Sequence, residues 1–133
     1  MSIQGGCHCG AVRYELRGEP KHTALCHCRD CRVSAGAPLV AWTAFADEDF
    51  TLLTGDLTTF NSSGMALRSF CPKCGTGIAY RNAEYLPGIV DVQTATLDDP
   101  AALPPQAHIQ TAERIGWMAE AHSLPEFERF PGG

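Results

Sequence analysis

The sequence has no excess of positive charge and no long apolar run, and each absence excludes a class of protein. Its 133 residues carry 10 lysines and arginines against 15 aspartates and glutamates, a formal net charge of -5. A general nucleic-acid binder usually presents a basic face, so we expect no nucleic acid among the partners. No apolar run approaches the roughly 18 residues of a membrane-spanning helix. The first residues also lack the charged and apolar regions of a secretory signal, so we expect a cytoplasmic protein that stays out of the membrane.

Signatures of several common enzyme classes are also absent. The sequence has no HExxH of a metalloprotease, no GxSxG of a serine hydrolase, and neither a P-loop nor a Rossmann glycine fingerprint. A zinc-dependent nucleobase deaminase would need an H-x-E and a P-C-x-x-C, and neither occurs. The function must therefore be sought in another set of residues.

Cysteine is the residue type that stands out. The chain has seven, in three clusters: Cys7-His8-Cys9, Cys26-His27-Cys28-Arg29-Asp30-Cys31 and Cys71-Pro72-Lys73-Cys74. An odd number of closely spaced thiols fits a disulfide framework poorly and a metal site well. A structural zinc takes four tetrahedral ligands, whereas a catalytic zinc takes three and keeps one position open. Seven thiols therefore predict one zinc of each kind.

The last cluster has the form of a zinc knuckle. Pro72 pre-sets its own φ angle in a tight turn, and Gly75 lets a backbone N–H approach a sulfur atom. The knuckle needs a second cysteine pair, which Cys7 and Cys9 can supply. The remaining three thiols would then form a triad whose open position can take a thiol as thiolate, hold water or polarise a carbonyl.

Other interpretations of the same cysteines remain open at this point. One of the histidines His8, His22 and His27, or a distant residue, could close the triad as a second structural site. The triad could instead be a redox thiol cluster. The two CxxC pairs could also combine into a zinc ribbon, which would leave Cys7, Cys9 and Cys26 as the separate group.

The rest of the chain predicts one β-rich domain over residues 1–133. Alternation of apolar and polar residues, bounded by turn residues, predicts nine strands: Gly10–Leu16, Thr23–Cys28, Leu39–Phe45, Phe50–Leu53, Leu57–Phe60, Ala66–Phe70, Gly77–Arg81, Gly88–Ala95 and Ala107–Thr111. A short helix should follow Asp99 as N-cap, and Ile115–Ala121 should form a helical turn or two. Six aromatic residues are expected to fill the core: Trp42, Phe45, Phe50, Phe60, Phe70 and Tyr80.

Taken together, the motifs resemble the glutathione-dependent formaldehyde-activating family and the related centromere-protein V-type domains. The resemblance covers nearly the whole chain in the family's order. It rests on Gly6-Cys7-His8-Cys9-Gly10, Cys26–Cys31, Gly36-Ala37-Pro38, Arg68–Gly75, Thr96–Pro100, Pro104-Pro105 before His108-Ile109, Trp117 and Leu124–Phe127.

The resemblance implies a mainly β fold, a zinc-bound β-tent of antiparallel sheets with short helices. It implies a structural zinc held by Cys7, Cys9, Cys71 and Cys74, and a second, catalytic zinc held by Cys26, Cys28 and Cys31. The family adds glutathione to formaldehyde, giving S-(hydroxymethyl)glutathione, and is classed as a carbon–sulfur lyase. We therefore expect a zinc-dependent carbon–sulfur lyase whose partners are a small thiol such as glutathione and a small aldehyde. The alternatives are a non-catalytic zinc-binding β domain that mediates protein interactions and a thiol redox protein.

Glutathione is an anion, so cations near the cysteines are candidates for binding its carboxylates. Arg29, Arg32, Arg68 and Lys73 lie in or beside the clusters. Ordinary surface charge, or pairing with a neighbour such as Asp30, is the simpler interpretation for each of them, and we favour it. Ser62 and Ser63 are expected only to form a turn.

Overall fold

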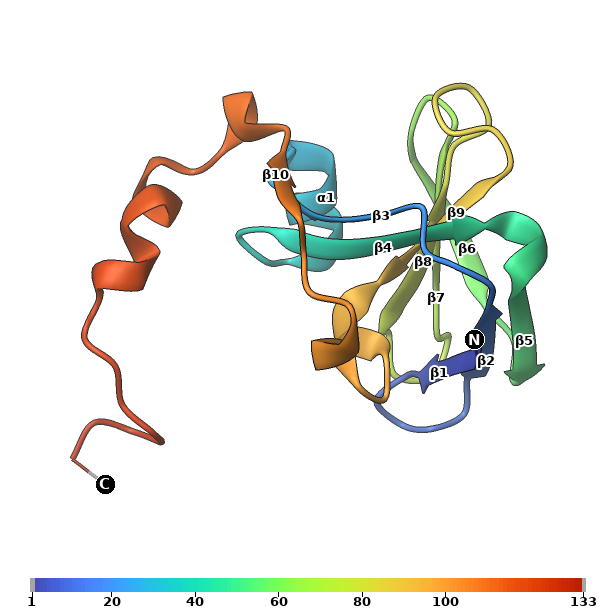
Figure 1. The fold of residues 1–133 in the computed structure, drawn as a ribbon, viewed down its shortest axis with the longest axis horizontal. Helices are drawn as coiled ribbons and strands as arrows, with labels where there is room; N and C mark the ends of the chain where they lie inside the picture. The colour runs from blue at the N-terminus through green and yellow to red at the C-terminus, as the bar shows by residue number, and fades with distance from the viewer. Residues whose placement is uncertain (1, 133) are drawn as a thin grey trace.

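The computed structural model describes residues 2–132, and they form two sheets with short helical segments (Figure 1). The small sheet has the order β1 (Ser2–Gly6), β2 (Arg13–Arg17) and β5 (Phe50–Thr54). The large sheet has the order β10 (Ala107–Ile109), β3 (His22–Cys26), β4 (Val40–Ala46), β9 (Ile89–Gln93), β8 (Gly77–Arg81), β7 (Ala66–Phe70) and β6 (Thr58–Ser63). The strand pairs are antiparallel except β10 with β3. The predicted mainly β fold of antiparallel sheets is thus confirmed.

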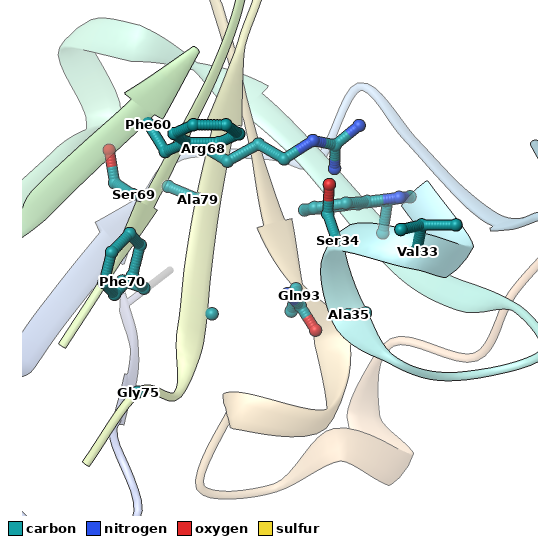
Figure 2. A pocket seen from close by; sticks show the side chains of 12 residues that line it. Val33, Ser34, Ala35, Phe60, Arg68, Ser69, Phe70, Gly75, Ala79 and Gln93 are labelled. Atoms are coloured by element: carbon teal, nitrogen blue, oxygen red, sulfur yellow. The ribbon is translucent and has the colours of Figure 1, made fainter. Parts of the chain in front are cut away.

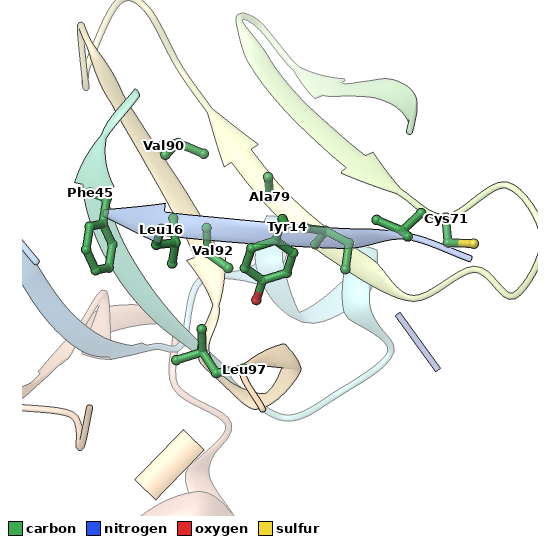
Figure 3. Packing of buried hydrophobic residues seen from close by; sticks show 10 residues of the cluster. Tyr14, Leu16, Phe45, Cys71, Ala79, Val90, Val92 and Leu97 are labelled. Atoms are coloured by element: carbon green, nitrogen blue, oxygen red, sulfur yellow. The ribbon is translucent and has the colours of Figure 1, made fainter. Parts of the chain in front are cut away.

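The main core lies between the small sheet and one face of the large sheet. Tyr14 and Leu16 of β2 are fully buried against Phe45, Val90 and Val92 of the large sheet (Figure 3). The spacing of two residues within β2 and within β9 puts each pair on one face of its strand. The small sheet does not cover the opposite face of the large sheet, and the candidate site lies on that face.

All nine predicted strands are present, with bounds shifted by a few residues, but the sequence did not predict the first strand or the α-helix. β1 contains no apolar alternation, and it pairs along its whole length with β2. α1 (Arg29–Ala35) begins within the second cysteine cluster and ends at Gly36, whose left-handed φ of 65° suits glycine. Sequence reasoning had treated that cluster only as a set of ligands.

The remaining helical segments are short and of the 3-10 type: Asp47–Asp49, Thr94–Thr96, Pro100–Ala102, Thr111–Glu113 and Gly116–Ser123. The turn after Asp99 is where it was predicted, with Asp99 as its N-cap residue, although the Asp99 side chain makes no capping hydrogen bond. Residues 114–132 extend away from the two sheets (Figure 1). In residues 2–132, the helices all fall short of the length and apolar character needed to cross a membrane.

The predicted aromatic core is correct only in part. Trp42 and Phe45 are buried, and Phe50, Phe70 and Tyr80 are half-buried. Phe60 is 61% exposed, because it lies on β6 at the edge of the large sheet. The prediction for Phe60 is therefore wrong.

The small sheet meets the rest of the fold so closely at Gly5 that a side chain cannot fit there. A Cβ atom at this position would collide with the Tyr14 hydroxyl and the Thr96 carbonyl. We expect Gly5→Ala to lower the free energy of unfolding by about 1–3 kcal/mol, as overpacking does. Urea unfolding in excess zinc measures the change. Gly116→Ala, which meets open space, is the control and should leave stability unchanged. Equal stability of the two variants would contradict the close packing at Gly5.

Candidate metal centres and the adjoining pocket

Four sulfur atoms from two distant segments converge at one end of the small sheet. Cys7 and Cys9 lie in the turn after β1, and their Sγ atoms are 3.6 Å apart. The Cys9 and Cys71 sulfurs are 3.9 Å apart, and with Cys74 all four lie within 4.8 Å of one another. Ligands at a zinc–sulfur bond length of about 2.3 Å should be roughly 3.8 Å apart in a tetrahedron. The spacing of this four-sulfur group therefore fits zinc.

Backbone N–H groups point at these sulfurs, as expected for thiolates that carry negative charge. The Val12 N–H donates to Cys7 Sγ over 3.2 Å. The N–H groups of Lys73 and Cys74 approach Cys71 Sγ at 3.4 and 3.5 Å. Gly75 has a φ of 81°, but its own N–H donates to the Cys71 carbonyl rather than to a sulfur. The glycine allows the knuckle turn, while the preceding residues supply the contacts to sulfur.

The other three cysteines form a second group, which we call the triad: Cys26, Cys28 and Cys31. Cys26 ends β3, Cys28 immediately precedes α1, and Cys31 lies in its first turn. The three sulfurs lie within 4.8 Å of one another, and Cys28 Sγ accepts the Cys31 N–H over 3.3 Å. Cys26 and Cys31 are buried against Val40 and Trp42. The triad can hold a metal and offers it three ligands.

The sulfurs do not form the zinc-ribbon grouping, because the two CxxC pairs fall into different groups. Among residues 2–132, no histidine joins the triad either. His27 is 1% exposed, and its Nε2 lies 2.9 Å from Nδ1 of His108. This contact links β10 to the end of β3, so His27 and His108 have a structural role.

Arg68 reaches the triad from β7. Its guanidinium lies 2.9 Å from Asp30 and 3.5 Å from Cys31 Sγ, and it covers the Tyr80 ring at 4.8 Å. The pKa of the Cys31 thiol is lowered to about 5, first by its hydrogen bond with Cys26 and then by Arg68. The half-buried Arg68 thus favours negative charge on Cys31. The hydrogen bond with Cys31 raises the pKa of Cys26, whereas burial raises that of Cys28.

Asp30 in turn is held by two serines that were expected only to form a turn. Ser62 and Ser63 lie at the end of β6, and both hydroxyls donate to Asp30 Oδ2, over 2.8 and 3.1 Å. Burial alone would raise the pKa of Asp30, but the hydrogen bonds from Arg68 and Ser62 hold that pKa below its ordinary value of 3.8. The prediction that the two serines only form a turn is therefore wrong, because both lie in β6 and contact Asp30.

A pocket of about 660 Å³ opens beside the triad, and all three of its cysteines line it. Trp42, Tyr80 and Arg68 form part of its wall. A second, mostly apolar pocket of about 590 Å³ lies between α1 and the strands β6 to β9 (Figure 2). Arg68 and Trp42 line both pockets. The triad is thus reachable by a small molecule from the first of the two pockets.

Asp91 of β9 also lines the triad pocket, and sequence reasoning did not single it out. The residue is 6% exposed, and its Oδ1 atom has no hydrogen-bond partner among the described residues. Burial raises the pKa of Asp91 to about 6. The available signal was a carboxylate in the middle of the most regular alternating strand. That pattern is equally typical of a strand with one face in solvent, so the sequence alone does not distinguish Asp91 from a surface carboxylate.

Of the four cations considered as candidates for carboxylate binding, only Arg68 lines the triad pocket. Its ion pair with Asp30 agrees with the simpler interpretation of its role. Arg32 donates through Nε to the His27 carbonyl over 3.1 Å, and Arg29 contacts Glu113 through its backbone N–H. The pocket therefore contains less free positive charge than the sequence suggested.

The comparisons with known proteins agree on one family. The model of the family "Glutathione-dependent formaldehyde-activating enzyme" matches residues 2–113. A Halomonas elongata protein, whose name provisionally assigns it as an enzyme of that type, is 26% identical over 99% of this chain and 88% of its own length. A Schizosaccharomyces pombe protein named as an uncharacterized lyase is 29% identical over 61% of this chain and 60% of its own.

A solved structure supports the fold. The crystal structure of a Rhodobacter sphaeroides protein superposes with a TM-score of 0.64 at 24% identity, and the match covers 80% of this chain and 99% of that one. At this identity the likeness concerns the fold alone.

The lowered pKa of Asp30 leads to a prediction about acid stability. A group whose pKa is lower in the folded state stabilises the fold above its ordinary pKa, and this contribution is lost as the pH falls through the folded pKa. We expect Asp30→Asn to reduce the free energy of unfolding by about 1–2 kcal/mol at pH 7, since water screens part of this pair. The difference from wild type should shrink below about pH 4. Urea unfolding of both proteins between pH 3 and pH 7 measures this difference in the free energy of unfolding.

Asp56→Asn, at an exposed position, is the matched control and should track the wild type at every pH. A constant difference between wild type and Asp30→Asn over the whole range would show that the Asp30 charge does not contribute.

Proposed function

Because this chain belongs to the glutathione-dependent formaldehyde-activating enzyme family, we propose that it is a zinc-dependent carbon–sulfur lyase. It would add a small thiol, with glutathione as the first candidate, to formaldehyde or a similar small aldehyde. The family description and the lyase name of the Schizosaccharomyces pombe relative support an enzyme of this general type.

The observation that carries the proposal is the difference between the two sulfur groups. The four-sulfur group can satisfy every position of a tetrahedral zinc, which suits a structural site. The triad can satisfy three positions, and its sulfurs line a pocket large enough for a small thiol. We therefore assign the structural zinc to Cys7, Cys9, Cys71 and Cys74, and the catalytic zinc to Cys26, Cys28 and Cys31.

The reaction needs one new carbon–sulfur bond and one proton transfer. The thiol loses its S–H proton, its sulfur attacks the aldehyde carbon, and the carbonyl oxygen takes a proton to become a hydroxyl group. Zinc held by the triad would supply a binding position at which a thiol ionises near neutral pH. The pocket would hold the aldehyde about 3–3.5 Å from that sulfur, so that the two reactants meet in the correct orientation.

Arg68 stabilises the negative charge that this chemistry needs beside the pocket. Its guanidinium lies next to Cys31 Sγ, and Asp30 together with Ser62 fixes its position. Because Asp30 neutralises much of the Arg68 charge, the arginine can support the triad without holding an incoming thiolate too strongly. Arg68 thus supports the charge and position of the triad and does not itself take part in bond making.

The zinc content of the purified protein tests the proposal directly. We expect two zinc ions per wild-type chain and one per chain of Cys28→Ser, with the far-UV circular dichroism unchanged. Glutathione should bind the wild type only, and NMR with labelled formaldehyde should show faster formation of S-(hydroxymethyl)glutathione with the wild type than with the variant. One zinc in both proteins after zinc has been added back, with no thiol binding, would instead favour a non-catalytic zinc domain that mediates protein contacts.

Loss of a cysteine from the four-sulfur group should lower stability more than loss of a cysteine from the triad. Cys71 is 0% exposed and belongs to the main core, so its loss disturbs packing as well as metal binding. We expect Cys71→Ser to lower the free energy of unfolding by about 4 kcal/mol or more, whereas Cys28→Ser lowers it by much less. Urea unfolding of the two variants, each in excess zinc, gives the comparison. Equal losses in both would argue against a division into structural and catalytic sites.

A further inference from the structure

The triad pocket carries more negative than positive charge. Its lining includes four acidic residues and, as possible cations, one arginine and one histidine: Asp30, Glu84, Asp91, Glu113, Arg68 and His22. Arg68 is already paired with Asp30. Three thiolates around one Zn²⁺ would add a further net charge of about -1. A negatively charged group would therefore enter this pocket against repulsion.

Asp91 is the buried member of this acidic set. It lies directly opposite Tyr80 of β8 and Ala44 of β4, and Tyr80 lies opposite Arg68 of β7. Directly opposed residues of antiparallel strands share a face of the sheet, so Asp91, Tyr80 and Arg68 point to the same side. That side is the triad pocket, because all three residues line it.

Within residues 2–132, the Asp91 carboxylate lacks the hydrogen-bond partner that buried carboxylates normally have. It is 6% exposed, and Oδ1 has no hydrogen bond in the described part of the chain. A buried charge without a partner is unfavourable, and a cation that supplies a hydrogen bond removes most of that penalty. The residue opposite it on β4, Ala44, carries only a methyl group and offers no donor. His22 of β3, which lies opposite Ala44, acts on Asp91 through its charge but makes no hydrogen bond to it in the described part of the chain. A hydrogen-bond partner for the carboxylate can therefore come from a group that enters the pocket.

We propose that Asp91 binds the ammonium group of the thiol substrate, and that the substrates of this enzyme are thiols with a protonated amine. The inference deepens the proposed function and rests on it. An ammonium provides three N–H donors, of which one would bind the Asp91 carboxylate, while its charge would offset the negative charge of the pocket. Glutathione meets the requirement through its single amino group. Its two carboxylates would stay toward the solvent, since the arginine of the pocket is already occupied.

The raised pKa of Asp91 agrees with this role. Burial raises it to about 6, His22 lowers it by its positive charge, and Cys31 raises it. An ammonium beside the carboxylate would reverse the effect of burial and keep Asp91 ionised. A carboxyl group with this pKa could alternatively donate a proton to the carbonyl oxygen, and the test has to separate the two roles.

Two sets of thiols, each matched for size, distinguish ammonium binding by Asp91 from proton donation by Asp91. Glutathione is compared with its deamino analogue, in which hydrogen replaces the ammonium, and cysteamine is compared with 2-mercaptoethanol and 3-mercaptopropionate. Affinity for the zinc-loaded protein is measured by calorimetry, and kcat and KM by NMR with formaldehyde. We expect wild type to bind each amino thiol about tenfold more tightly than its uncharged partner and to bind 3-mercaptopropionate most weakly.

Asp91→Asn should reduce this preference to about twofold while the zinc content stays at two per chain. Glu84→Gln is the matched control, because it removes the same charge from an exposed position in the same pocket. It should leave the preference close to that of wild type. If Glu84→Gln abolishes the preference as fully as Asp91→Asn does, the general charge of the pocket and not a contact to Asp91 is responsible, and the inference fails.

The remaining outcomes are also decisive. Equal affinity of wild type for amino and deamino thiols overturns the inference, whatever Asp91→Asn does and even if that variant does not fold. A fall in kcat that is the same for all thiols, with the preference intact, makes Asp91 a proton donor and likewise overturns it. If wild type prefers cysteamine but accelerates no hydroxymethyl thiol formation, ammonium binding stands and the proposed lyase function fails.

Discussion

Four sulfur atoms have to meet from segments more than sixty residues apart, and the rest of the structure depends on that meeting. The turn after β1 brings Cys7 and Cys9 beside the knuckle of Cys71 and Cys74 between β7 and β8. This contact closes one end of the space between the two sheets. The main core fills that space, and Cys71 itself is part of it. Metal binding at this group and burial of apolar surface would therefore stabilise the same arrangement of the two sheets.

One face of the large sheet packs in the main core, and the other face lines the triad pocket. Val90 and Val92 of β9 face the small sheet and belong to the core, whereas Asp91 between them faces the triad pocket. A single strand thus supplies apolar packing on one side and a buried carboxylate on the other. Because the core holds β9 rigidly, the position of Asp91 relative to Tyr80 on the neighbouring strand is well defined.

Electrostatics around the triad follows from a short chain of contacts. Arg68 touches both Asp30 and Cys31, and the serines at the end of β6 hold Asp30 in place. The arginine favours a thiolate at Cys31, and Asp30 balances the charge of the arginine before any ligand arrives. The acidic residues that remain then determine which charges the pocket accepts. Support for the triad and selection among its ligands are thus carried by different side chains.

The sequence by itself determined the nine alternating strands and the cysteine motifs, because both depend on local spacing. Alternation with a period of two marks a strand wherever it lies, and CxC and CxxC spacing predicts metal ligands without knowledge of the fold. The family resemblance added the partition of the cysteines that matches the two sulfur groups found in the structure.

Tertiary structure alone decided the rest. Pairing with β2 makes a strand of β1, which has no alternation of its own. Arg68 meets Asp30 only because β7 and α1 come together across thirty-eight residues of sequence. The alternation of β9 indicated that Val90 and Val92 share one face and Asp91 lies on the other. It did not indicate whether that second face meets water or a pocket, because exposure is set by the elements that pack over a strand and not by the strand itself.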